Sequence, residues 1–134
     1  MVRSLVILSF SLGSLAEDRR AAVLERDGRR GLQAFPSFDS DARKRKWNPW
    51  SYIDARDGAQ AVRKALEARF TGFEAFIIAN ADTVMTRANS ALIAEVFPGV
   101  EIRPTMSANG TLLSIDKARR MLGYHPQHSW RNHV

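Results

Sequence analysis

The sequence predicts an α/β fold, with a small mixed or parallel sheet and flanking helices. Short segments rich in branched and aromatic apolar residues alternate along the chain with segments whose apolar residues recur at helical spacing. The length of 134 residues suits a single domain with a core of its own. The composition is 45% hydrophobic and 25% charged, as in ordinary globular proteins, and the absence of cysteine excludes disulfides and thiolate metal sites.

The N-terminal part, residues 1–34, is expected to contribute one strand and one helix. Residues 4–10 are rich in Leu, Val and Ile, which is typical of a strand buried on both faces in a parallel sheet. Residues 17–26 form a candidate helix that is charged and peripheral. Residues 1–16 also resemble a signal peptide, with Arg3 before an apolar run that is too short to span a bilayer. We favour a buried strand and a cytoplasmic protein without membrane contact, and keep export as the alternative.

Residues 29–50 are expected to form a loop with one short helix, because prolines, glycines and serines interrupt them. The basic run Arg43–Lys46 precedes Trp47 and Trp50. Cations beside aromatic rings can bind nucleic acid through phosphate contacts and stacking. We favour a solvated basic surface over anchored tryptophans, because no nucleic-acid-binding motif accompanies the run.

The segment from Trp47 to Phe70 is predicted to be a short strand that leads into a helix. Tyr52 and Ile53 have the β propensity of a brief strand, and Asp57 is positioned as the helix N-cap. The apolar residues that follow at helical spacing are expected to face the core: Ala59, Val62, Ala65 and Leu66.

Three more elements are expected downstream. Residues 73–79 should form a buried strand, and residues 86–97 a helix that Thr86 caps. A last helix should begin at Ser114 and end at Gly123, since glycine readily adopts the left-handed conformation of a helix terminus.

Two segments carry a family resemblance. YIDARDGAQAVRKALE resembles the part of NAD-dependent epimerase/dehydratase enzymes, the extended short-chain dehydrogenase/reductases, in which a strand ending in aspartate leads into an alanine-rich helix. LLSIDKARRMLGYHPQHSW resembles the C-terminal signature of the same family. Together the matches cover roughly residues 35–131, which in such enzymes is the C-terminal, substrate-binding part. Residues 1–34 diverge, since VILSFSLGS stands where the family usually has a strand with a pattern like Arg-Phe-Ser-Asn.

The resemblance implies an oxidoreductase or isomerase that uses NAD or NADP on a sugar or nucleotide-sugar-like substrate. Such an enzyme needs a glycine-rich turn after its first strand, and residues 28–31 lack both the spacing and the preceding strand. The family's catalytic tyrosine is followed four residues later by lysine, whereas Tyr52 is followed at that spacing by Arg56 and Tyr124 by His128. We therefore assign no catalytic or cofactor-binding residue and leave enzyme activity open. The chain is expected to lack the complete nucleotide-binding Rossmann domain and not to bind NAD or NADP alone.

Four residues are candidate substrate-binding groups: Trp50, Tyr52, Asp54 and Arg56. Aromatic side chains can pack on a sugar or nucleotide ring, and arginine offers a bidentate fork to phosphate. Alternatively, both aromatics belong to the core, and Arg56 forms an ion pair with Asp57 at the start of the helix. Trp50 also stands where nucleotide-sugar epimerases often have the arginine that holds the diphosphate.

The remaining partners are open. No metal site is assigned to His125, His128 and His133, because Pro126 interrupts their spacing. The net charge of +6 can attract phosphates, nucleotides, nucleic acid or anionic surfaces. Besides a small-molecule substrate, we expect either a homo-oligomer or a missing cofactor-domain partner. A stand-alone interaction or ligand-binding module is one alternative function, and nucleic-acid binding through Arg43–Lys46 is the less favoured other.

Overall fold

The computed structural model describes the backbone of residues 5–10 and all atoms of residues 35–102 and 106–133. Its elements are β1 (Leu5–Phe10), η1 (Phe35–Arg45), α2 (Ala55–Glu67), β2 (Phe73–Ile78), α3 (Asn89–Val96), α4 (Asp116–Leu122) and η2 (Trp130–Asn132). This mixture of helices and strands confirms the α/β class in its coarse form. The predicted helix at residues 17–26 lies outside the described residues, as does most of the signal-like segment 1–16. None of the helices in the described ranges is long and apolar enough to span a bilayer.

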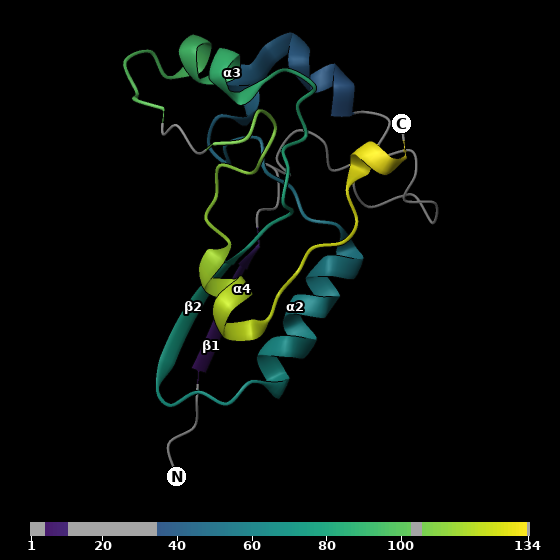
Figure 1. Ribbon diagram of the computed structural model, residues 1–134, viewed down its shortest axis with the longest axis vertical. Coiled ribbons are helices and arrows are strands. Elements are labelled where there is room, and N and C mark those ends of the chain that lie inside the picture. The colour runs from purple at the N-terminus through teal and green to yellow at the C-terminus, as the bar shows by residue number, and fades with distance from the viewer. Residues whose placement is uncertain (1–4, 11–34, 103–105, 134) are drawn as a thin grey trace.

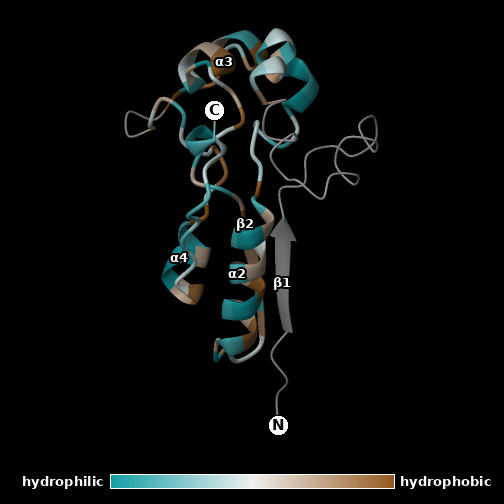
Figure 2. Ribbon diagram, turned by 90° about the vertical axis from the view of Figure 1, so that its right-hand side faces the viewer, coloured by the Kyte–Doolittle hydropathy of each residue, from teal (hydrophilic) through white to brown (hydrophobic). Residues whose placement is uncertain are grey.

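The molecule is elongated, with its elements gathered at two ends. Figure 1 shows β1, β2, α2 and α4 at one end and η1 and α3 at the other, and Figure 2 shows the same division from the side. β1 and β2 pair in parallel, with Leu5 opposite Phe73 and Phe10 opposite Ile78. The C-terminal segment runs from α4 back toward η1, so that it passes both ends (Figure 1).

Each end has its own hydrophobic core. The lower core packs β2 against α2 and α4 through Ala61, Ala65, Phe76, Ile78, Ala79, Ile115, Ala118, Leu122 and Tyr124. The upper core joins η1, α3 and the C-terminal segment through Ala42, Trp50, Tyr52, Val84, Met85, Leu92, Ile93, Val96 and Trp130. Asn80 and Thr83 are buried polar residues between the two sets along the chain. The cores are therefore separate clusters that polar groups connect.

The predicted strand at Tyr52 and Ile53 is wrong. Ser51 forms an isolated antiparallel bridge with Thr83, and the carbonyl of Tyr52 accepts from the amide of Asn80. The segment is held by these few bonds to the loop after β2, and no ladder continues on either side of Ser51 within the described residues. Tyr52 and Ile53 have high strand propensity, but the segment beside them is a loop and not a strand, so no sheet forms there in the described part of the chain.

The predicted start of the central helix is also wrong, because Asp54 and not Asp57 is the N-cap. The Asp54 carboxylate accepts from the amide of Arg56 at 2.9 Å, and α2 begins at Ala55. Asp57 lies in the first turn and is fully buried. Its carboxylate binds the C-terminal segment and so is not available as a cap.

The phase of α2 follows from that burial. Asp57, Ala61 and Ala65 repeat every fourth residue and form the buried face. Of the predicted face, only Ala65 is buried, whereas Val62 is 41% and Leu66 82% exposed. The small side chains at 61 and 65 let the helix approach the lower core closely, and Ala59 faces solvent with the two larger residues.

The other predicted boundaries shift by a few residues. Thr86 donates its hydroxyl to Asp39, so it does not cap α3, which begins at Asn89 without a side-chain cap. The predicted last helix, α4, begins at Asp116, two residues after Ser114, whose hydroxyl lies 3.4 Å from the Asp116 carboxylate. The predicted stop at Gly123 is confirmed, since its φ of 65° is left-handed. The short helix predicted within residues 29–50 corresponds to η1.

Candidate functional site

The C-terminal segment, residues 124–131, bonds to both ends of the molecule. The Tyr124 hydroxyl donates to the carbonyl of Ala79 at 2.9 Å, directly beyond β2. The side chain of Gln60 on α2 exchanges two hydrogen bonds with the backbone of His125, both at 3.0 Å. These contacts fix the start of the segment against α2 and β2, so the polar residues that follow reach defined positions.

The buried Asp57 carboxylate and the half-buried His128 imidazole form a pair at the N-terminus of α2. The Asp57 carboxylate accepts from the amide of Gln127 at 3.0 Å and from that of His128 at 2.9 Å. The same carboxylate lies 2.8 Å from Nδ1 of His128. An ionised carboxylate can only accept, so the shared proton lies on Nδ1, and Nε2 becomes the acceptor nitrogen of the neutral ring. The His128 side chain is 31% exposed, which gives solvent access to an oriented imidazole.

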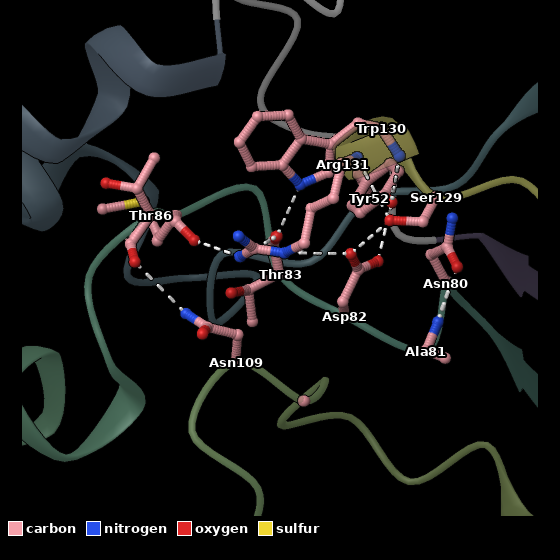
Figure 3. A network of polar contacts seen from close by, with 12 residues as sticks. Tyr52, Asn80, Ala81, Asp82, Thr83, Thr86, Asn109, Ser129, Trp130 and Arg131 are labelled. Carbon is pink, nitrogen blue, oxygen red and sulfur yellow. Dashed lines mark hydrogen bonds and ion pairs between the residues drawn. The ribbon is translucent and has the colours of Figure 1, made fainter. Parts of the chain in front are cut away.

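A second carboxylate, Asp82, accepts from Tyr52 and from two residues of the C-terminal segment (Figure 3). The Tyr52 hydroxyl donates to Oδ1 and the Ser129 hydroxyl donates to Oδ2, each at 2.7 Å. Arg131 adds an ion pair, with Nε 3.2 Å from Oδ2. The amide of Trp130 donates to the Tyr52 oxygen at 3.1 Å, so this hydroxyl both donates and accepts. Burial, followed by the bond to Asp82, raises the pKa of Tyr52. That direction favours the neutral phenol, whereas a catalytic base needs the opposite.

The structure divides the four predicted substrate-binding residues into two pairs. Trp50 is fully buried in the upper core and donates Nε1 to the carbonyl of Ala42 at 2.8 Å. Tyr52 lies in the same core, with its ring edge-on to Phe35 at a centroid distance of 5.3 Å. The predicted alternative that both aromatics are core residues therefore agrees with their burial.

Asp54 and Arg56 lie together at the N-terminus of α2. Nε and Nη2 of Arg56 donate to the two oxygens of Asp54, each at 2.9 Å. This side-chain bond holds the pKa of Asp54 below its ordinary value. The ion pair at the helix start thus joins Arg56 to Asp54, and the predicted pair with Asp57 is wrong. Substrate binding by the four residues stays a prediction, and a phosphate at Arg56 would compete with Asp54.

An open groove of about 640 Å³ lies between α3, α4 and the loop that joins them. Its apolar wall includes Ile93, Ile102, Met106, Leu112, Leu113 and Ile115. Its polar side includes the hydroxyls of Ser107, Thr111 and Ser114 and the charges of Glu101, Asp116 and Arg119. Sequence reasoning missed this groove, although all of its lining residues except Ala81 and Ile93 lie within residues 101–119. The run of hydroxyls and apolar residues at 111–115 was the signal that could have indicated it.

Within residues 35–102 and 106–133, no group of three or more His, Asp or Glu could hold a metal ion. Comparison of the chain with protein-family models, with curated proteins and with solved structures finds no match.

Proposed function

We propose that this chain is the substrate-binding part of an NAD(P)-dependent epimerase/dehydratase-like oxidoreductase or isomerase, which acts on a sugar or nucleotide-sugar-like substrate and is inactive without a cofactor domain. The observation that supports it most is the unequal burial of β2. Phe76 and Ile78 are buried against α2 and α4, whereas Phe73 is 58% and Ile77 42% exposed on the opposite face.

A strand that is apolar on both faces belongs inside a parallel sheet with helices on both sides. β1 and β2 are parallel, and the two strands in the described part of the chain are too few for a stable sheet without further packing. A polypeptide that supplied more strands and a second helical layer would cover Phe73 and Ile77. The cofactor domain that the family resemblance implies has this architecture.

The groove supports the substrate-binding half of the proposal. Ala81, which lines the groove, lies three residues beyond the carboxyl end of β2, the end at which open α/β sheets bind ligands. Hydroxyl residues together with the charged Glu101, Asp116 and Arg119 suit the hydroxyls of a sugar, and the apolar lining residues suit a sugar or base ring. A stand-alone ligand-binding module would use the same groove without a cofactor domain.

The test separates the two halves of the proposal. Calorimetric titration of the chain with NAD and with NADP should show no binding, and micromolar binding of either would overturn the missing-domain interpretation. Nuclear magnetic resonance titration with uridine diphosphate glucose should shift the amides of the groove. Arg119→Ala should weaken that binding, whereas Arg120→Ala is the matched control, because Arg120 is exposed on the same helix but does not line the groove. Equal effects of the two substitutions would contradict the groove assignment.

A further inference from the structure

The basic run Arg43–Lys46 is divided by the fold, and only part of it faces solvent. Arg45 donates Nη2 to the carbonyl of Ser51 at 3.1 Å, and its guanidinium lies 4.7 Å above the ring of Phe38. Burial lowers the pKa of Arg45, as expected for a cation in the protein interior. Arg45 is therefore a structural residue and not part of an exposed basic surface.

The turn after η1 has an unusual conformation at Trp50. Its φ of 56° is the only positive value at a non-glycine residue in the described part of the chain. A bulky side chain adopts this region only where its surroundings enforce it. The amide of Trp50 donates to the carbonyl of Arg45 at 3.3 Å, and the amide of Ser51 to that of Asn48 at 2.9 Å. With the indole of Trp50 fully buried, these bonds hold the turn in one shape.

This turn presents Trp47 to solvent. Trp47 is 85% exposed, the largest exposure among the large hydrophobic residues that the structure describes. The Lys46 ammonium lies 4.6 Å from the centre of its ring, in cation–π contact. Lys44 has a side chain 75% exposed and only a loose ion pair with Asp41 at 3.7 Å. An exposed indole is thus in contact with the half-exposed Lys46 ammonium, and the exposed Lys44 lies three residues earlier in the chain.

Arg43, the first residue of the basic run, is also exposed. Its Nη2 donates to the carbonyl of Glu95 at 3.2 Å, which leaves the other guanidinium donors for an anion. The chain as a whole carries a net charge of +6, so an approaching polyanion meets a favourable field. η1 carries two acidic residues that oppose it: Asp41 pairs loosely with Lys44, and the Asp39 carboxylate accepts from the Thr86 hydroxyl.

We propose that the Trp47 surface, defined as Arg43, Lys44, Lys46 and Trp47, binds single-stranded nucleic acid. An unpaired base stacks on the indole, and the neighbouring phosphates lie at the two lysines. A duplex offers phosphates but no free base face, so it contacts only the cations. A membrane interface would require a cluster of apolar anchors, and Trp47 is the exposed large hydrophobic residue of this turn. This inference does not depend on the proposed epimerase-like function.

The test uses the full chain with fluorescently labelled oligothymidylate and a duplex of equal length. Fluorescence anisotropy should give tighter binding to the single strand, and Trp47→Ala should weaken it about tenfold, since base–aromatic stacking is worth about 1.4 kcal/mol or more. Trp47→Phe should retain most of the affinity. Lys44→Gln should lower the slope of log affinity against log salt by about 0.7, as expected for one phosphate contact with a single strand.

Leu66→Ala is the matched control, because Leu66 is 82% exposed on α2, toward the other end of the molecule. It should leave the affinity unchanged. Since Trp47 is exposed, its substitution should leave the circular dichroism spectrum intact. Equal binding of single strand and duplex, or no effect of Trp47→Ala, would overturn the inference. Binding to phosphatidylserine vesicles without binding to the oligonucleotide would overturn it as well.

Discussion

Asp57→Asn is expected to lower the free energy of unfolding by about 3 kcal/mol, because it disrupts the hydrogen bonds that hold the C-terminal segment. Asp57 is fully buried. Oδ1 accepts from the Gln127 amide and interacts with Nδ1 of His128, while Oδ2 accepts from the His128 amide. Asparagine preserves the volume and one acceptor oxygen, but its NH2 group then faces an amide donor.

The magnitude follows from these three contacts. A hydrogen bond to a charged group is worth about 1.5–3 kcal/mol, and one such bond is lost where two donors meet. The two others change from charge-assisted to neutral bonds, which are roughly half as strong. With the lower value of that range, about 1.5 kcal/mol is lost with the first bond and about 0.75 kcal/mol with each weakened one, so the loss is at least about 3 kcal/mol, a large part of the roughly 5–15 kcal/mol that stabilises a domain.

Urea unfolding followed by circular dichroism would measure this loss. Hydrogen exchange of the Gln127 and His128 amides should accelerate in the same variant. Asp116→Asn is the control, because the Asp116 side chain is 77% exposed and its ion pair with Arg119 is 3.5 Å long. That change should cost less than about 1 kcal/mol. If both variants lost similar stability, or if Asp57→Asn cost under about 1 kcal/mol, the inference that Asp57 holds the C-terminal segment in place would be wrong.

Three further outcomes are expected. Burial raises the pKa of both tyrosines, Tyr52 and Tyr124, so tyrosinate absorbance should not develop near pH 10 while the chain is folded. Because the unfolded chain ionises first, the free energy of unfolding should fall as the pH rises above about 10. Reversible ionisation of either tyrosine in the folded state near pH 10 would contradict this. The arginine partner lowers the pKa of Asp54, so the contribution of Asp54 to stability is present above about pH 4 and is lost as the pH falls through its folded pKa. In Asp54→Asn, the free energy of unfolding should therefore depend less on pH in this acidic range. An unchanged acid profile would count against it. The exposed apolar face of β2 should cause self-association in sedimentation experiments, and replacing Phe73 and Ile77 by serine should reduce it; a monomeric parent chain at high concentration would refute the idea.

Local signals were sufficient for several elements of the fold. A continuous apolar run predicted β1, and a second such run predicted β2. The stop at Gly123 was predictable because a single residue there must adopt a left-handed conformation. In each case the information lies within a few neighbouring residues, which is the range over which composition and periodicity act.

The role of Asp57 could not be predicted in this way. Its partner His128 lies 71 positions away in the sequence, and nothing near Asp57 distinguishes a cap from a buried acceptor. In the structure the cap is Asp54, three residues earlier in the chain. The buried residues Asp57, Ala61 and Ala65 define the face of α2 that packs inward, so Val62 and Leu66 are exposed although their apolar spacing predicted the opposite.

The C-terminal segment, residues 124–131, contacts both hydrophobic cores. The C-terminal segment contributes Tyr124 to the lower core and Trp130 to the upper core. Between them, the two buried or half-buried carboxylates, Asp57 and Asp82, accept the donors that burial would otherwise leave unpaired. Asp82 follows the end of β2, beside Ala81 at the mouth of the groove. Asp82 therefore anchors the C-terminal segment at the position next in the chain to a residue that lines the groove.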